Sequence, residues 1–100
     1  MAMTEDPVRA LAECRERIDR IDQKLVDLLN ERTAVAEEIG RIKRGSNLPV
    51  YEPKREDQVF ANVTAGNKGP LTNDAVRRVF ERIIDEMRRV QKFRMEEKES

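Results

Sequence analysis

The sequence predicts an all-α protein of three helices: one long, one short and one of medium length. Of its 100 residues 40% are charged, 4% are aromatic, and none is Trp or His. The apolar residues recur at helical spacing, which is the primary signal of amphipathic helices. Glu, Lys, Arg, Leu, Ile and Val in such a pattern are typical of helical bundles and coiled coils. The length predicts a single domain over residues 1–100.

The first helix is expected over residues 7–43, where core positions alternate steps of three and four through about five heptads. One charged residue interrupts the series, which reads Leu11, Cys14, Ile18, Ile21, Leu25, Leu28, Arg32, Val35, Ile39 and Ile42. In "RGSNLP", Gly45 and Asn47 tolerate left-handed backbone geometry and Pro49 cannot continue a helix. These residues therefore end the first helix.

The second helix is expected over residues 53–66, where Glu56 shares one face with apolar side chains. The third is expected over residues 72–95, with Thr72 or Asn73 as its N-cap. The apolar stripe of the third helix is Val76, Val79, Phe80, Ile83, Ile84, Met87 and Val90, and Gln91 lies in phase with it.

The length of the first helix predicts a second chain. A helix of about 37 residues is about 55 Å long, whereas a compact 100-residue monomer has a radius of gyration of about 13 Å. Two shorter helices cannot cover an apolar stripe that continues to both ends of the long one. We therefore expect an obligate homodimer with two-fold symmetry, in which the helices form one bundle.

Composition excludes several classes of function. With no His and a lone Cys14, the familiar zinc sites and the Ser-His and Cys-His catalytic pairs are ruled out. Twenty basic residues balance twenty acidic ones, so no overall field favours nucleic acid or an anionic membrane. The N-terminal residues do not resemble a signal peptide and no apolar run reaches transmembrane length. We expect a cytoplasmic protein that uses no metal and no cofactor.

The charged residue in the seam, Arg32, has two interpretations. A polar residue at such a position can fix the register of a coiled coil, but a buried charge needs a partner. Arg15 and Lys43 occupy the heptad column beside the seam, where each alone is explained as a solvated flanking residue. Together the three place cations along one face. Arg15 is about 25 Å from Arg32 on the same helix, but an antiparallel partner could bring its own Arg15 alongside.

Such a face suits a small polyanion. Arg pairs with carboxylates through two hydrogen bonds, so a dicarboxylate is favoured over phosphate. Gln91 and Glu56 could project into the same site, although Gln91 could equally be a core amide with a local partner. Acid–base chemistry would rest on Glu52 and Glu56 alone. The residue set better fits catalysis by positioning and by fixed charges placed where negative charge develops.

Three stretches of the sequence together resemble a known protein family. The stretch "LAECRERIDRIDQKLVDLLNERTAVAEEIGRIK", followed by "LPVYEPKRE" and "VRRVFERIIDEMRRVQ", resembles the all-helical chorismate mutases from about Leu11 to Gln91. The family's spacing of two arginines and a lysine on the first helix is matched by Arg15, Arg32 and Lys43. The spacing to Glu52, Arg55 and Glu56 in "YEPKRE" is matched as well.

The resemblance implies an intertwined homodimer and the cofactor-free Claisen rearrangement of chorismate, a dicarboxylate, to prephenate in phenylalanine and tyrosine synthesis. It implies that Arg32 and the partner's Arg15 hold the carboxylates. It also implies that Lys43 and Gln91 donate to the ether oxygen. By the same resemblance Glu56 binds the ring hydroxyl, Glu52 lies beside it, and Arg55 supports the site or a carboxylate.

The sequence departs from the family pattern twice. Glu52 stands where members often carry Asp, and Met87 stands where some place a Ser near a carboxylate. Two rival functions stay open: an isochorismate–pyruvate lyase on the same bundle, and a non-catalytic helical regulatory or interaction module. The carboxylate of Glu56 favours the mutase over the lyase, and the polar residues in apolar phase argue against a scaffold.

Overall fold

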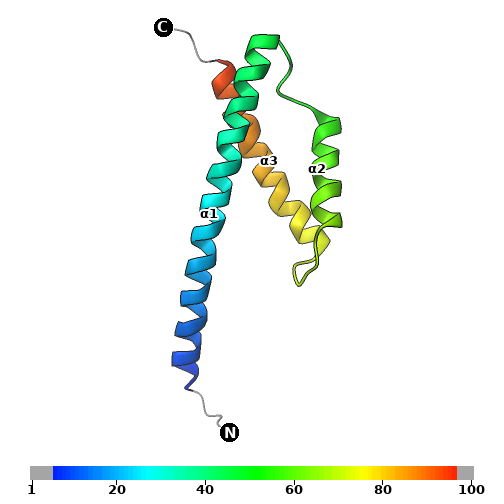
Figure 1. Cartoon of the computed structure of the whole chain (residues 1–100). Coiled ribbons are helices and arrows are strands. Elements are labelled where there is room, and N and C mark those ends of the chain that lie inside the picture. The colour runs from blue at the N-terminus through cyan, green and yellow to red at the C-terminus, as the bar shows by residue number, and fades with distance from the viewer. Residues whose placement is uncertain (1–5, 97–100) are drawn as a thin grey trace. The chain divides into compact units, whose positions relative to one another are not determined.

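The protein is described by a computed structural model that covers residues 6–96. This part of the chain forms three helices and no strand: α1 (Pro7–Ser46), α2 (Pro53–Ala65) and α3 (Asn73–Met95) (Figure 1). The predicted all-helical fold with one long, one short and one medium helix is confirmed. None of these helices combines the length and the apolarity needed to cross a membrane.

The end of α1 lies three residues beyond the predicted boundary at residue 43, because Gly45 and Ser46 stay helical. Asn47 then takes the left-handed conformation, with φ 58°. The Leu48 N–H donates to the Lys43 carbonyl at 3.0 Å, which is the six-to-one bond of a Schellman motif. The backbone of Lys43 is therefore part of the helix cap.

The ends of the other helices lie within one residue of the predicted ones. Helix α2 ends at Ala65 rather than 66, and α3 begins at Asn73 rather than 72. Of the two possible caps of α3, the structure selects Thr72, whose hydroxyl accepts the Ala75 N–H at 3.1 Å. A threonine hydroxyl at the N-cap satisfies a backbone donor that the helix leaves without a partner.

The chain divides into two compact units, residues 1–32 and 33–100, which are described separately. In the described part of the first unit, α1 carries its apolar seam as a solvent-exposed stripe. At least half of each side chain is exposed at Leu11, Ile18, Ile21, Leu25 and Leu28. The first unit thus exposes a row of large apolar side chains to solvent, which is unusual for the surface of a monomeric protein.

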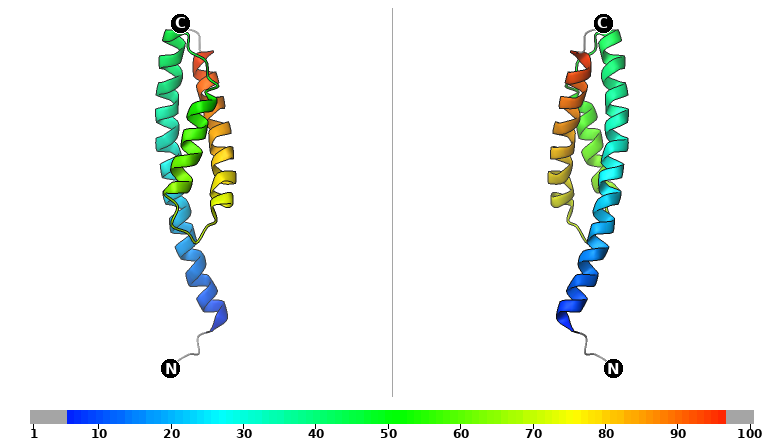
Figure 2. Two further views of the ribbon diagram at one scale, coloured as in Figure 1. Left: turned by 90° about the vertical axis from the view of Figure 1, so that its right-hand side faces the viewer. Right: turned by 90° about the vertical axis from the view of Figure 1, so that its left-hand side faces the viewer.

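The second unit contains the last turns of α1 together with α2 and α3. Its small core consists of Ala36 from α1 and of Val76, Ile84 and Met87 from α3. Helix α3 begins beside the end of α2 and finishes beside the last turns of α1 (Figures 1 and 2). Helix α2 contributes no buried residue, so partly exposed side chains hold it against α3.

Candidate active site

A buried lysine is the centre of the candidate site. The Lys43 side chain, in the last turns of α1, is 6% exposed. Its Nζ donates to Gln91 Oε1 at 2.9 Å and to the Val50 carbonyl at 3.2 Å, and lies 3.4 Å from Glu52 Oε1. Burying an ammonium group is costly unless oxygen atoms replace its water. The three oxygens replace that water and hold the ammonium group in place.

Gln91 meets Lys43 from α3, where it follows the apolar stripe. Because its Oε1 accepts a hydrogen bond from Lys43, its Nε2 amino group points elsewhere with its two N–H donors. The pair therefore presents a full positive charge and an amide donor side by side. The structure thus brings Lys43 and Gln91 together, while their roles in a site stay predictions.

Close packing between α1 and α3 sets the spacing of this pair. Gly40, one turn before Lys43, is buried. A Cβ at Gly40 would lie 3.0 Å from the Gln91 carbonyl oxygen and 3.0 Å from Arg94 Cβ. Arg94 also forms an ion pair with Glu37 of α1, with its Nε 2.8 Å from Glu37 Oε2. The glycine thus permits the helix approach that the Lys43–Gln91 bond needs.

A second charged pair joins α2 to α3. Arg88 Nε donates to Glu56 Oε2 at 2.8 Å and Arg88 Nη2 donates to Glu56 Oε1 at 2.9 Å. The hydrogen bond raises the pKa of Arg88 above its ordinary value, and the charges of Glu56 and Asp85 act in the same direction against partial burial. These interactions therefore favour the charged form of Arg88.

Glu52 and Glu56 lie one turn apart at the start of α2, and the Glu56 N–H donates to the Glu52 carbonyl at 3.0 Å. Each carboxylate has its own cation, Lys43 for Glu52 and Arg88 for Glu56. Cations from α1 and α3 therefore converge on the first turn of α2. The sequence pattern predicted both glutamates as candidate site residues, whereas Arg88 was not predicted.

Arg55 and Met87 lie in different surroundings. Arg55 is exposed, and its Nη1 donates to Gln58 Oε1 at 3.4 Å. It lines an open hollow of about 510 Å³ with Glu52, Pro53, Lys54 and Gln58, which neither Lys43 nor Gln91 lines. Met87 is buried in the core, where its sulfur accepts a 3.7 Å hydrogen bond from Thr33 Oγ1. The substrate-binding roles of both residues stay predictions.

Arg15 and Arg32 belong to the first unit, residues 1–32. Arg15 is exposed on α1. The predicted association of both arginines with the Lys43 group depends on how the units and a second chain assemble. It stays a prediction, as does the assignment of residues 1–100 to one domain.

The profile of the family described as chorismate mutase type II matches residues 14–92. The chain belongs to the type II chorismate mutase family. The matched stretch includes the Lys43–Gln91 and Glu56–Arg88 pairs, and the resemblance seen in the sequence is confirmed.

The relatives include longer bifunctional proteins and a protein of similar length to this chain. A bifunctional chorismate mutase/prephenate dehydratase of Aquifex aeolicus is 40% identical over 78 residues, which are 74% of this chain and 22% of that protein. The chain thus spans about a fifth of the length of the bifunctional relatives. A chorismate mutase of Methanocaldococcus jannaschii is 29% identical over 91 residues, which are 90% of this chain and 92% of that one.

Solved structures of the type II chorismate mutase family share the fold. Form II of the Thermus thermophilus enzyme aligns with a TM-score of 0.79 and 33% identity, over 87% of this chain and 96% of that one. The Helicobacter pylori chorismate mutase in complex with prephenate aligns with a TM-score of 0.83 and 26% identity. That alignment covers 91% of this chain and 99% of the other.

The sequence did hold a signal for Arg88. Glu56 shares a face with apolar residues on α2, and a carboxylate in such a place needs a cation. The segment "MRRVQ" supplies two arginines beside the apolar stripe of α3. Only the crossing of α2 and α3 decides that Arg88 reaches Glu56, while Arg89 pairs with Asp85 and Glu86 on its own helix.

Proposed function

We propose that the protein catalyses the cofactor-free rearrangement of chorismate to prephenate. The observation that carries this proposal is the buried Lys43 ammonium beside the Gln91 amide, in a chain of the type II chorismate mutase family. The Helicobacter pylori relative was solved in complex with prephenate, the product of that reaction. This supports the same chemistry on the same fold.

The rearrangement of chorismate is accelerated by a positive charge held in a fixed position near the ether oxygen. The rearrangement breaks a carbon–oxygen bond, and negative charge builds on the ether oxygen in the transition state. A buried cation and an oriented amide donor stabilise that charge without reorganising, and such stabilisation is usually the largest single contribution to catalysis. Lys43 supplies the charge, and Gln91 supplies Nε2 because its Oε1 is held by the lysine.

The remaining predicted residues bind and orient the substrate. Arg32 and the second chain's Arg15 hold the two carboxylates and select the reactive conformer. Glu56 accepts from the ring hydroxyl and Glu52 lies beside it. Arg55 supports the site or a carboxylate, and Met87, whose sulfur accepts from Thr33, makes no charge-assisted hydrogen bond to the substrate. Holding the substrate in its reactive geometry can lower the barrier of a unimolecular reaction.

The proposal includes a homodimer. Its support is the stripe from Leu11 to Leu28, which is at least half exposed at each large residue. Val35, Ile39 and Ile42 continue exposed apolar positions into the second unit. We infer that a second copy of the chain packs against this stripe, because the same apolar surface on two chains can pair about a two-fold axis. A cytoplasmic location stays a prediction of the sequence.

The lyase and the non-catalytic module make different predictions for one measurement. The protein is incubated separately with chorismate and with isochorismate, the loss of absorbance of each compound is followed, and the products are identified. The proposed function requires prephenate at a rate far above the uncatalysed one. A lyase instead releases pyruvate from isochorismate, and a non-catalytic module consumes neither compound.

A further inference from the structure

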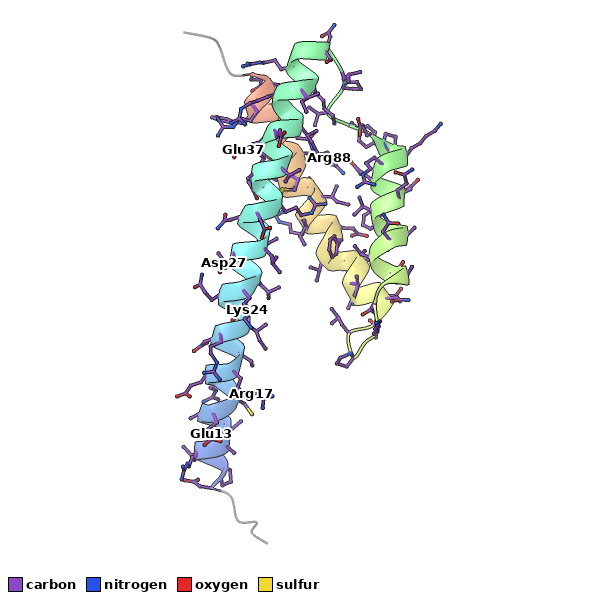
Figure 3. All side chains as sticks on the ribbon, viewed as in Figure 1. Glu13, Arg17, Lys24, Asp27, Glu37 and Arg88 are labelled. Carbon is purple, nitrogen blue, oxygen red and sulfur yellow. The ribbon has the colours of Figure 1, made fainter. Side chains whose placement is uncertain are left out.

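The ion pair between Arg88 and Glu56 is a two-bond clamp between α3 and α2. Both carboxylate oxygens of Glu56 accept from Arg88, at 2.8 and 2.9 Å. Figure 3 labels Arg88 on α3, on the side that faces α2. Pairing of this fork-to-fork kind fixes orientation as well as charge.

Arg88 is itself held on its other sides. Its Nη1 lies 3.6 Å from Asp85 Oδ1, and its Cζ lies 5.6 Å from the centre of the Tyr51 ring. A guanidinium between a carboxylate and an aromatic ring has little freedom to turn. Glu56 is 18% exposed, and the guanidinium that it faces is contacted on its other sides by Asp85 and Tyr51.

This clamp defines what Glu56 can accept. An ionised carboxylate has about four lone-pair positions and no donor. Arg88 occupies one position on each oxygen, so about two stay open. Any molecule that lies against Glu56 must then bring a hydrogen-bond donor. A methyl group or an ether oxygen against Glu56 would leave an acceptor position of the carboxylate without a hydrogen bond, which is costly in a partly buried site.

The clamp also lies close to the proposed reaction centre. Gln91 follows Arg88 by three residues on α3, so the two are neighbours on the helix surface. Glu56 follows Glu52 by one turn on α2, and Glu52 lies 3.4 Å from Lys43. A substrate that reaches the Lys43–Gln91 pair is therefore within reach of the clamped carboxylate.

We propose that Arg88 is a positioning and specificity-determining residue, which holds Glu56 as an acceptor-only group so that the site selects a substrate with a hydroxyl there. This inference rests on the proposed function. The competing interpretation is an ion pair that only ties α2 to α3.

The test compares Arg88→Met with a matched control, Arg89→Met. Arg89 is the next residue on α3, and its ion pairs go to Asp85 and Glu86 of the same helix. Steady-state rates are measured with chorismate and with its methyl ether, in which the ring hydroxyl has lost its proton. Helicity and the thermal midpoint are recorded for each variant.

We expect Arg88→Met to raise KM for chorismate about tenfold or more with kcat changed less than threefold, because a hydrogen bond to a charged group contributes to binding in both states. Arg88→Lys should recover part of the loss. The methyl ether should be bound equally weakly by the wild type and by Arg88→Met. Arg89→Met should stay within twofold of the wild type.

A double-mutant cycle separates action through Glu56 from independent action. Glu56→Gln combined with Arg88→Met should be no worse than Glu56→Gln alone. The inference would be overturned if the two substitutions together lowered kcat/KM by the product of their separate effects. It would also be overturned if Arg88→Met lost as much activity with the methyl ether as with chorismate, or if folded Arg88→Met had unchanged kinetics. If Arg88→Met does not fold, Arg88→Lys carries the same cycle. A wild type that leaves chorismate unchanged defeats the proposed function itself, which is a different result.

Discussion

Lys43 Nζ donates a 2.9 Å hydrogen bond to Gln91 Oε1 across 48 residues of sequence. The bond joins the last turns of α1 to the end of α3. It makes two residues from opposite ends of the second unit act as one group. Oxygen atoms of Gln91, Val50 and Glu52 replace the water that the buried ammonium group has lost.

Removal of the lysine should abolish most of the rate. Deleting one donor to a developing oxyanion typically costs about 10²–10³ in kcat, and Lys43→Ala removes a full charge. We expect at least that loss with chorismate, measured by initial rates, while circular dichroism still shows a helical protein. Lys54→Ala, at an exposed lysine in the first turn of α2, is the control and should retain wild-type rates.

Arg32→Ala should eliminate turnover with little change in helicity. The residue interrupts the apolar seam of α1, and its proposed task is to bind a substrate carboxylate. Arg41→Ala, at an exposed position on the same helix, should leave the rate unchanged. Near-normal kcat/KM in Arg32→Ala would remove Arg32 from the site.

Mixing two inactive variants tests the shared site. If Arg15 acts in the second chain's site, an Arg15→Ala chain and an Arg32→Ala chain form a heterodimer with one intact site and one doubly defective site. Unfolding and refolding an equal mixture should restore about a quarter of the wild-type activity. No recovery despite subunit exchange, or a folded monomer in sedimentation at micromolar concentration, would contradict the proposed dimer.

Gly40→Ala should weaken both stability and activity. The added Cβ would meet the Gln91 carbonyl and Arg94 Cβ at 3.0 Å. Overpacking costs about 1–3 kcal/mol, which exceeds the gain of up to about 1 kcal/mol from replacing a helical glycine. Gly45→Ala is the matched control, because nothing lies within 4 Å of a Cβ there. It should unfold at an equal or higher denaturant concentration than the wild type.

Thr72→Ala should lower stability without changing the site. Loss of the N-cap bond to the Ala75 N–H typically costs about 1 kcal/mol. The change is expected in the midpoint of urea unfolding, with KM and kcat unaltered. A shift in KM would mean that the start of α3 also takes part in binding.

Local patterns predicted the three helices, and among the candidate site residues that they indicated, the structure brings Lys43, Gln91 and Glu52 together. The break at "RGSNLP" predicted the end of α1, and the left-handed Asn47 confirms the mechanism. Lys43 and Gln91 were found because polar side chains in or beside an apolar stripe need partners. Arg88 was missed because its partner depends on how α2 crosses α3. Arg15 and Arg32 stay predictions, because their surroundings depend on a second chain.

The connector from Asn47 to Glu52 has a further consequence for what the chain can tolerate. Leu48 caps α1 through the Lys43 carbonyl, and the Val50 carbonyl accepts from the lysine Nζ. Surface loops ordinarily absorb insertions, but one residue added here would displace the bond to the Lys43 backbone carbonyl or the carbonyl that accepts from the Lys43 side chain. This connector should therefore be fixed in length.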